Sequence, residues 1–454
     1  MKKLFLPEIR IKHGQKTRQT GRPLGIGPIF GVIVAVLIFS CSGKTKKTAP
    51  GTKTAVATKT KIKNVKNTKK PVKNTEIVLW HSYRGLEKNA LEQVTKQFNN
   101  LHNGVRVKLL QVPYDAFVDK VQITTPRGQG PDLFIFAHNM IGEWVDDTPI
   151  LEPLTNLIPR TELDKFLPKT IESLIYKGNI YGLPLAFKSV ALFYNKAMVK
   201  TPPATFDQMV HAAQAVTKPD KGIWGLVYEA GLFYFNAAWF NGLGASVLGT
   251  DNMPRLDTPQ AIKAMLLIKS LVKQYKITPS GVTSAMVTSL FNQGKAAMVI
   301  NGPWFLAELN PKIKYGVTLM PKLAYGGLAK PYLGTEAVYL SKYSKKKQAA
   351  IKFMLFLTSD KAAKTRLNKG RQMVANKSVY TNELFQKNPV AKTFWVEAKT
   401  SVIMPKQPDM QLIWPVMDMA ISKSVFGDID AKKALKEAQA KVMADLRNKA
   451  EVKK

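Results

Sequence analysis

Residues 127–139 read RGQGPDLFIFAHN, and this stretch indicates both the class of fold and the position of a candidate site. A Gly-Gln-Gly-Pro turn leads to Asp132, and the apolar run Leu133–Phe136 predicts a short strand that is buried on both faces. Strands of this kind are typical of parallel sheets that are covered by helices. The run ends on the tripeptide Ala-His-Asn, 137–139, so polar side chains are expected at its carboxyl end.

Two further strands are predicted upstream of this run. Ile77–Trp80 is apolar, and residues 105–112 largely alternate between apolar and polar side chains. Apolar residues at helical spacing lie between these strands (Ala90, Leu91, Val94 and Phe98), and Phe117–Val121 is a short helical piece before the third strand. The order β-α-β-α-β implies a parallel, doubly wound α/β sheet with right-handed crossovers. Ligands of such sheets lie beyond the carboxyl ends of the strands, which here lead into residues 81–84, 113–115 and 137–140.

A second α/β region follows. Residues 176–199 contain a Gly-Asn turn, a buried run and another strand, and residues 287–300 read helix, turn, strand. Further helices are predicted at Phe206–Val216, Ala261–Tyr275, 346–357 and 431–449. The chain has 454 residues and is 45% hydrophobic, so it can build two domains with cores of their own.

The net charge of +37 is unevenly distributed. Residues 1–75 hold 18 lysines and arginines and one acidic residue, Glu8, so nearly half of the excess lies in the first sixth of the chain. Such a balance is compatible with binding to nucleic acid or anionic lipid, or simply with a solvated basic surface. The last reading is favoured for scattered lysines.

The single cysteine, Cys41, follows a basic leader, the apolar residues Ile29–Phe39 and Ser40. The apolar stretch is shorter than the ~20 residues of a membrane-spanning helix, and a basic region, a short apolar region and a small residue are typical of a secretory signal. The sequence LIFSC, 37–41, resembles the bacterial lipoprotein box, in which the cysteine is acylated. An uncleaved N-terminal anchor is the alternative. Either way the chain is expected to be tethered to a membrane and to lie outside the cytoplasm.

Residues 42–75 contain 11 lysines and no acidic residue. Lysine, threonine, asparagine, alanine and proline predominate, and such a segment cannot build a core. We therefore expect a disordered, extended tether, whose lysines could lie against anionic lipid headgroups.

Signatures of catalysis are weak. The five histidines share no metal-ligand spacing, and neither a nucleophile elbow nor a phosphate-binding loop is present. Paired carboxylates cannot be judged from spacing alone, and Asp115 and Glu336 are the best candidates for an acid and a base at strand ends. No metal site and no cofactor are predicted.

Aromatic residues gather instead near strand ends and turns. For any one tryptophan, core packing is the favoured reading, but several aromatic rings beside polar groups suit a cleft that stacks on sugar rings. The residues in such places are Trp80, Tyr83, Phe136, Phe233, Tyr234, Trp239, Trp304, Tyr332 and Trp414.

Several longer motifs carry a resemblance over almost all of residues 76–454. They are WHSYRGLEKNALEQVTKQFN from Trp80, GPDLFIFAHN from Gly130, YKGNIYGLPLAFKSVALFYNKAMVKTPPATFDQM from Tyr176, FNQGKAAMVINGPW with YGVTLMP from Phe291, and IMPKQPDMQLIW from Ile403. In order and spacing they resemble the family 1 extracellular solute-binding proteins, in particular the maltose/maltodextrin-binding branch.

The resemblance implies a two-lobed periplasmic-binding-protein fold of type II, with a hinge of crossing strands and a ligand cleft between two α/β lobes. The N-terminal lobe would comprise residues 76–186 and 337–382, and the C-terminal lobe residues 190–332 and 388–450, after a signal segment 1–41 and a tether 42–75. It also implies a monomeric non-enzyme without a cofactor. This protein would deliver a di- or oligosaccharide to an ABC permease that is powered by a separate ATPase, and it would not bind nucleic acid.

Site residues transfer one by one. Trp304 and Trp414 match stacking tryptophans of the family, and Phe136 stands where maltose binders have a third. The polar positions depart from the family. Asn139 and Met140 replace an aspartate and an arginine, Lys188 replaces a glutamate near the hinge, and Arg84 lies near the position of an aspartate. The predicted ligand-binding residues are Trp80, Tyr83, Arg84, Phe136, Asn139, Lys188, Phe233, Tyr234, Trp304, Glu336 and Trp414, with Cys41 as the lipidation site.

The change from acidic to basic residues keeps other ligands open. Arg84 and Lys188 make an anionic or phosphorylated sugar plausible, unless Arg84 is a surface residue and Lys188 pairs with Glu336 across the hinge. A carbohydrate-active enzyme and a polyanion-binding surface protein are alternatives of other classes. In the opening stretch, Leu133–Ile135 should be core, Phe136 and Asn139 should face the ligand, and His138 could either shape the cleft or contact the sugar.

Overall fold

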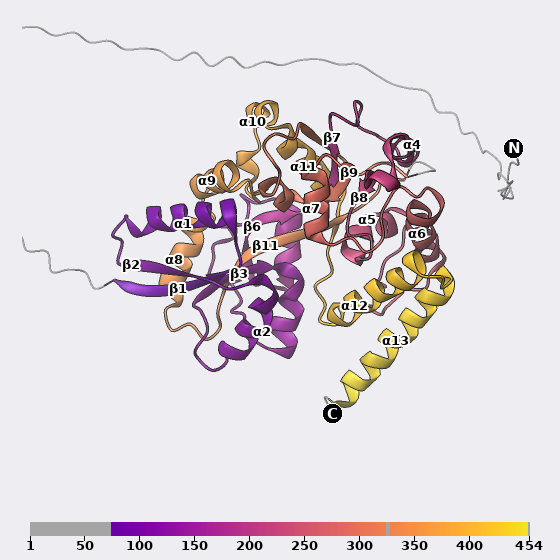
Figure 1. Ribbon diagram of the computed structural model, residues 1–454. Helices are drawn as coiled ribbons and strands as arrows, with labels where there is room; N and C mark the ends of the chain where they lie inside the picture. Colours follow the sequence, from indigo (N-terminus) through magenta and orange to yellow (C-terminus); the bar gives the residue numbers. More distant parts are fainter. Residues whose placement is uncertain (1–73, 324–326, 453–454) are drawn as a thin grey trace, which may run out of the picture. The chain divides into compact units, whose positions relative to one another are not determined.

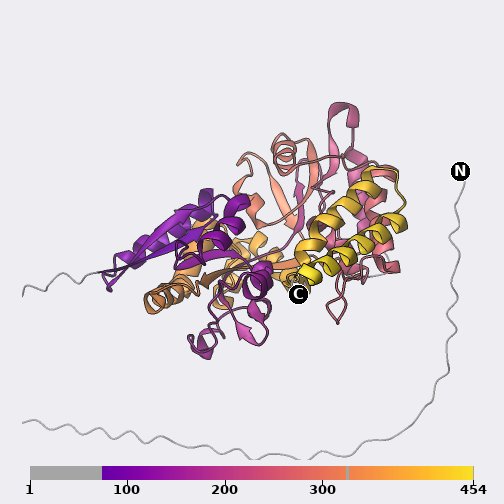
Figure 2. The same cartoon turned by 90° about the horizontal axis from the view of Figure 1, so that it is seen from below.

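The computed structural model describes residues 74–323 and 327–452, which belong to one compact unit, Lys69–Lys454. The predicted signal segment with Cys41 and nearly all of the predicted tether lie outside the described residues. Two α/β lobes make up this unit, each built on its own sheet (Figures 1 and 2).

The first sheet has the order β12-β11-β3-β1-β2, and β6 also pairs with β11. Its strands are β1 (Thr75–His81), β2 (Val105–Gln111), β3 (Leu133–Ala137), β6 (Gly182–Lys188), β11 (Tyr332–Leu340) and β12 (Val402–Ile403). The pairs β1–β2 and β1–β3 are parallel, which confirms the predicted β-α-β-α-β unit. By contrast, β11 runs antiparallel to both β3 and β6, which the strand pattern did not predict.

Helices cover this sheet. They are α1 (Gly85–Asn99), α2 (Tyr114–Thr124), α3 (Pro168–Leu174), α8 (Lys347–Leu357) and α9 (Asp360–Gly370), and the small hairpin β4 (Ile175–Tyr176) and β5 (Asn179–Ile180) follows α3. The buried residues of α1 include Ala90, Leu91, Val94 and Phe98, the four positions at helical spacing in the sequence. The first four residues of β3, Leu133–Phe136, are all buried, which confirms a strand covered on both faces.

The second sheet has the order β10-β7-β9-β8. Its strands are β7 (Ala191–Asn195), β8 (Trp224–Val227), β9 (Ala296–Asn301) and β10 (Tyr315–Thr318). The surrounding helices are α4 (Phe206–Val216), α5 (Phe233–Gly242), α6 (Pro259–Lys269), α7 (Ser284–Asn292), α10 (Asn382–Lys387), α11 (Pro389–Thr400), α12 (Met410–Ile421) and α13 (Ala431–Val452). The single helix expected at Ala261–Tyr275 is instead α6 followed by a π-helical turn, Ser270–Gln274.

The chain crosses between the sheets on strands that are bonded to one another. β6 ends at Lys188 and β7 begins at Ala191, so the first crossing takes two residues. β11 pairs with β6 on one side and with β12 on the other, and the hydroxyls of Ser189 and Ser401 lie 3.0 Å apart. This arrangement confirms the predicted hinge of crossing strands. The exact lobe boundaries, 76–186 with 337–382 and 190–332 with 388–450, stay a prediction.

Candidate functional site

The second lobe contributes a cluster of aromatic rings to the candidate site. Tyr234 at the start of α5 and Trp304 in the 3-10 helix Pro303–Ala307 have ring centroids 6.2 Å apart, and both are half-buried. Trp414 of α12 is also half-buried, and it packs against Phe233 at 5.6 Å and Tyr332 at 5.9 Å. Phe233 is fully buried, so it supports Trp414 from behind.

Local sequence explains the position of Trp304. A Cβ atom at Gly302 would lie 2.1 Å from the indole ring of Trp304, so the ring can fold back over the backbone only because position 302 is glycine. Pro303 follows at the first position of the 3-10 helix, where its missing N–H costs no hydrogen bond. The Gly-Pro-Trp sequence at the end of β9 therefore holds the indole at the strand's carboxyl end.

The first lobe contributes a charged, hydrogen-bonded group at the crossing strands. The Tyr83 hydroxyl donates to Glu336 Oε2 at 2.7 Å, and Lys188 Nζ lies 3.0 Å from Glu336 Oε1. Glu336 is 8% exposed, and the side chain of Lys188 is 29% exposed. Burial alone would lower the pKa of Lys188, but Glu336 and Glu87 raise it above its ordinary value. Lys188 is therefore an ion-paired cation, which agrees with the alternative that it pairs with Glu336 across the hinge.

Glu87 of α1 belongs to the same group, although the sequence gave no sign of it. Its carboxylate accepts a hydrogen bond from Gln372 Nε2 at 3.3 Å. Burial raises the pKa of Glu87, Lys188 opposes this shift, and Glu336 adds to it. Arg366, fully buried beneath, donates to the Leu185 carbonyl and also lies within electrostatic reach of Glu336. At the floor of the site, the negative charges of Glu87 and Glu336 are thus offset by the positive charges of Lys188 and Arg366.

Phe136 is not open to a ligand in this structure. It is 4% exposed, and its ring stacks on Phe117 at 4.9 Å and on Tyr114 at 5.1 Å, with interplanar angles of 14° and 22°. Tyr114 itself is 58% exposed, so it presents the outer ring of this stack to solvent. The sequence held a signal for Tyr114, because residues 113–115 leave the second strand at the ligand edge, but Asp115 was chosen there.

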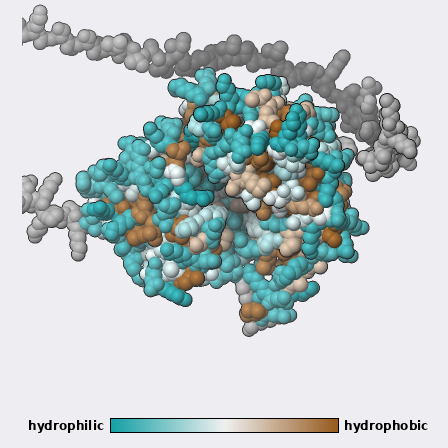
Figure 3. Space-filling model, in the orientation of Figure 1, coloured by the Kyte–Doolittle hydropathy of each residue, from teal (hydrophilic) through white to brown (hydrophobic). Residues whose placement is uncertain are grey.

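Tyr114 of the first lobe and Tyr234 of the second are both influenced by the charge of Lys188. Burial raises the pKa of the Tyr234 hydroxyl, Lys188 opposes this, and Tyr114 adds to it. The surrounding protein also removes part of the water around the Tyr114 hydroxyl and so raises its pKa, although the residue is 58% exposed, with Lys188 lowering the pKa and Glu336 raising it. Each tyrosine thus lies within electrostatic reach of Lys188. Figure 3 shows the surface hollowed where the lobes meet, with hydrophobic residues along the hollow's edge.

Four residues that the sequence singled out lie apart from these contacts. Trp80 is 5% exposed and packs in the core of the first lobe, with Lys120 Nζ 5.0 Å from its ring centroid. Arg84 precedes α1, is exposed, and forms no side-chain hydrogen bond or ion pair within the described part of the chain. Asn139 is half-buried in the 3-10 helix His138–Met140. Asp115 is exposed in the first turn of α2.

His138 connects the crossing strands. Its Nε2 lies 2.8 Å from the Met404 carbonyl, and its Nδ1 accepts a hydrogen bond from the Thr335 N–H at 2.9 Å. Both ring nitrogens are used within the protein and the side chain is fully buried, so His138 shapes the hinge and has no free polar atom for a sugar. An Nδ1 that accepts requires the neutral ring with its proton on Nε2.

We expect the free energy of unfolding to decrease as the pH is lowered, because the folded protein holds His138 in its neutral form. Burial lowers its pKa to about 4, from 6.5. As the pH falls, the His138 side chain takes up a proton in the unfolded chain before it does so in the folded protein. The contribution of neutral His138 to the free energy of unfolding is therefore complete above about pH 6.5 and is lost as the pH falls toward 4. About 2 kcal/mol of it is lost between pH 7 and 5. Urea unfolding of wild type and His138→Gln at both pH values measures this. The loss should be smaller in His138→Gln but unchanged in His211→Gln, a matched variant at an exposed position on α4.

Within residues 74–323 and 327–452, no group of three or more histidine, cysteine, aspartate or glutamate side chains could hold a metal ion. The same residues include no helix that is long and apolar enough to cross a membrane.

Two α/β lobes joined by crossing strands, with aromatic and charged groups where they meet, define a two-lobed binding protein of type II. Residues 84–364 match the model of the bacterial extracellular solute-binding protein family. The match covers more than half of the chain, so the chain belongs to this family.

Known relatives and structures agree with this assignment. The chain is 27% identical over 380 residues to the maltotriose-binding protein of Pyrococcus abyssi (strain GE5 / Orsay), covering 82% of each. It is 26% identical to the galactooligosaccharide-binding protein of Bacillus subtilis (strain 168), covering 83% of this chain and 90% of the relative. A crystal structure of a cyclo/maltodextrin-binding protein complexed with maltotetraose is similar with a TM-score of 0.73 and 29% identity, over 84% of this chain and 99% of that one.

Proposed function

We propose that this protein is the extracytoplasmic substrate-binding component of an ABC importer and that it binds a maltodextrin-like di- or oligosaccharide. The observation that carries the proposal is the pairing of half-buried rings on one lobe, Tyr234, Trp304 and Trp414, with a hydrogen-bonding floor of Tyr83, Lys188 and Glu336 on the other. Ring faces stack on sugars, and the floor fixes their hydroxyl groups. Relatives named for maltotriose and galactooligosaccharide binding support this ligand class.

The charge of the site favours a neutral sugar over the anionic alternative. Lys188 is paired with Glu336, which also accepts from Tyr83, so Lys188 has no unbalanced charge for a phosphate. Arg84 is the cation that keeps the anionic reading open, because its side chain is exposed and makes no ion pair with any described residue. Adding a phosphorylated sugar to the ligand panel tests this reading.

The enzyme alternative finds less support. An acid and a base must exchange protons with the substrate, whereas the carboxylate of Glu336 is held by Lys188 and Tyr83. Its proposed partner, Asp115, is an exposed residue at the start of α2. The relatives compared are named as binding proteins. We therefore propose that the protein binds its ligand without turnover.

Isothermal titration with maltose, maltotriose, maltotetraose, a galactooligosaccharide and glucose 6-phosphate tests the proposed function. We expect saturable binding of at least one neutral oligosaccharide, no binding of glucose 6-phosphate, and no cleavage product after prolonged incubation. Affinity should change little with salt, since a polyanion-type interaction would weaken steeply instead. Failure of every neutral oligosaccharide to bind would overturn the proposed ligand class, and the appearance of shorter products would establish an enzyme.

Within this site we propose that Tyr114 takes the stacking position that the sequence assigned to Phe136. Tyr114→Ala should weaken oligosaccharide binding by roughly 3- to 10-fold, because one stacked ring contributes about 0.5–1.5 kcal/mol. Tyr114→Phe keeps the ring and should bind within about 2-fold of wild type, which separates the ring from its hydroxyl. Titration of the two variants measures the difference. Equal affinity of Tyr114→Ala and wild type would contradict the role of Tyr114.

We also propose that Cys41 is acylated and anchors the protein to a membrane, from which it delivers ligand to a permease as a monomer. A relative, the maltooligosaccharide ABC transporter solute-binding lipoprotein of Streptococcus pneumoniae serotype 4 (strain ATCC BAA-334 / TIGR4), is 24% identical over 80% of this chain and 87% of its own. Mass spectrometry of the purified N-terminus decides between the possibilities. An intact Met1 with an unmodified Cys41 would leave the uncleaved anchor as the correct reading.

A further inference from the structure

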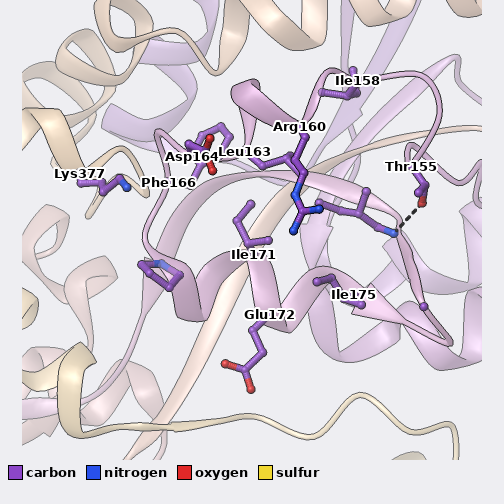
Figure 4. Close-up of a pocket in the computed structure, with 13 residues that line it drawn as sticks. Thr155, Ile158, Arg160, Leu163, Asp164, Phe166, Ile171, Glu172, Ile175 and Lys377 are labelled. Atoms are coloured by element: carbon purple, nitrogen blue, oxygen red, sulfur yellow. Dashed lines mark hydrogen bonds between the residues drawn. The ribbon is translucent and has the colours of Figure 1, made fainter.

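A cavity of about 570 Å³ lies in the first lobe, apart from the candidate sugar site. It is lined by residues of the loop 155–166, by α3 with the β4–β5 hairpin, and by Lys377, and most of these residues are exposed, so it opens to solvent (Figure 4). None of the predicted ligand-binding residues lines it. Its volume is in the range of sites that hold small molecules. The cavity is therefore large enough for a ligand of its own.

The floor of this cavity is aliphatic. Ile158 and Ile180 are buried beneath it, and Ile171 and Ile175 of the adjoining segment extend the apolar surface toward solvent, with Ile175 42% exposed. Phe166 also lines the cavity but is only 1% exposed, so it offers no ring face. The surface thus suits a flexible hydrocarbon, whereas the flat aromatic faces that stack on sugars are missing from its lining.

Two cations and two acids line the cavity, and all four are exposed: Arg160, Lys377, Asp164 and Glu172. In Figure 4 the guanidinium of Arg160 lies over the cavity beside Ile171, whereas the carboxylate of Glu172 points away from it. The Arg160 side chain makes no hydrogen bond or ion pair with any residue in the described ranges. The nearby acid Glu162 is bonded to Lys165 instead. A guanidinium with free N–H donors matches a carboxylate in two parallel hydrogen bonds.

We propose that this cavity binds a medium-chain aliphatic carboxylate. The carboxylate accepts hydrogen bonds from Arg160, and the hydrocarbon chain covers Ile171 and Ile175. Of the four charged residues along the lining, Arg160, Lys377, Asp164 and Glu172, the guanidinium of Arg160 is the group that Figure 4 shows beside Ile171, so an anionic head fits there better than a cationic one. The aliphatic floor fits an alkyl body better than a saccharide. This site is independent of the proposed sugar site, since the two share no lining residue.

Isothermal titration of the full chain with octanoate tests the proposal, with octan-1-ol and octyltrimethylammonium as probes of the same chain length. We expect octanoate to bind and Arg160→Gln to weaken it about 10-fold, since a hydrogen bond to a charged group is lost. Arg127→Gln is the matched control, at an exposed arginine outside the cavity, and should bind as wild type does. Ile171→Asn should also weaken octanoate binding by removing part of the apolar floor.

Two further measurements separate this cavity from the sugar site. Trp304→Ala should leave octanoate binding unchanged, and Arg160→Gln should leave oligosaccharide binding unchanged. The proposal would be overturned if octanoate does not bind, if Arg160→Gln binds it as tightly as wild type, or if octyltrimethylammonium binds equally well. Displacement of octanoate by a bound oligosaccharide would likewise assign it to the sugar site.

Discussion

Trp304→Ala is expected to weaken oligosaccharide binding on the order of 100-fold. The indole is half-buried beside Tyr234 at the carboxyl end of β9, where Gly302 allows it to fold over the backbone. Removing a tryptophan from the centre of a binding surface typically costs 2 kcal/mol or more, and each 1.4 kcal/mol is a factor of ten in affinity. Isothermal titration with the best oligosaccharide of the panel measures the loss, and the ligand-induced rise in melting temperature should disappear with it.

Trp395→Ala is the matched control for this variant. Trp395 is also half-buried, but it lies on α11 and stacks on Tyr380 at 4.3 Å, in a group that contains no predicted site residue. Its loss should lower the melting temperature without changing the affinity for the sugar. Equal affinity in Trp304→Ala and wild type would remove Trp304 from the binding site, and equal losses in both variants would show that the effect is one of folding.

Lys188→Met is expected to lower the free energy of unfolding by about 3 kcal/mol. Lys188 Nζ is 3.0 Å from Glu336 Oε1, and the carboxylate side chain of Glu336 is only 10% exposed. Without Lys188 the carboxylate keeps, among the described residues, only the Tyr83 hydroxyl as a hydrogen-bond partner, so a buried charge loses its paired cation. Urea unfolding at pH 7 measures the change.

The Lys188→Met, Glu336→Gln double variant separates the ion pair from other effects of substitution. It should be more stable than Lys188→Met alone, because the neutral amide no longer requires a cation. Lys108→Met serves as control, since Lys108 and Glu76 form a pair at 2.9 Å whose side chains are 62% and 43% exposed, and such surface pairs contribute about 1 kcal/mol or less. A loss in Lys188→Met no larger than that in Lys108→Met would contradict the buried pair.

The spacing of apolar residues predicted the strands and helices of the first lobe well, because a buried face requires apolar side chains at regular intervals. The apolar run of β3, the strands β1 and β2 and the spacing of Ala90, Leu91 and Val94 on α1 all match the structure. Strand β11 shows the limit. It lies between β3 and β6 and runs antiparallel to both, yet more than 140 residues separate it from either strand in sequence. A strand pattern does not specify its partner, so this return came only from the family resemblance.

The residues of the candidate site likewise fall into some that the sequence could predict and others that it could not. Trp304 lies beside Tyr234, and Trp414 packs on Phe233, the neighbour of Tyr234 in sequence, because each is fixed by its own strand end or helix. Their role in ligand binding stays a prediction. The motifs could not predict the exposure of Phe136. It depends on Tyr114, a residue on another element that stacks over the Phe136 ring. The contact of Glu87 with Gln372 joins residues 285 positions apart and leaves no local signal.

The sequence by itself therefore determined the class of this protein, its α/β elements and the aromatic residues of its second lobe. Apolar periodicity and Gly-Pro turns act over a few residues, and a single chain displays them fully. The tertiary structure decided that Lys188 is paired with Glu336, that His138 is a neutral connector of the hinge, and that Tyr114 covers Phe136. Each of these depends on which side chain from a distant segment fills the neighbouring space, and packing sets that only when the whole chain has folded.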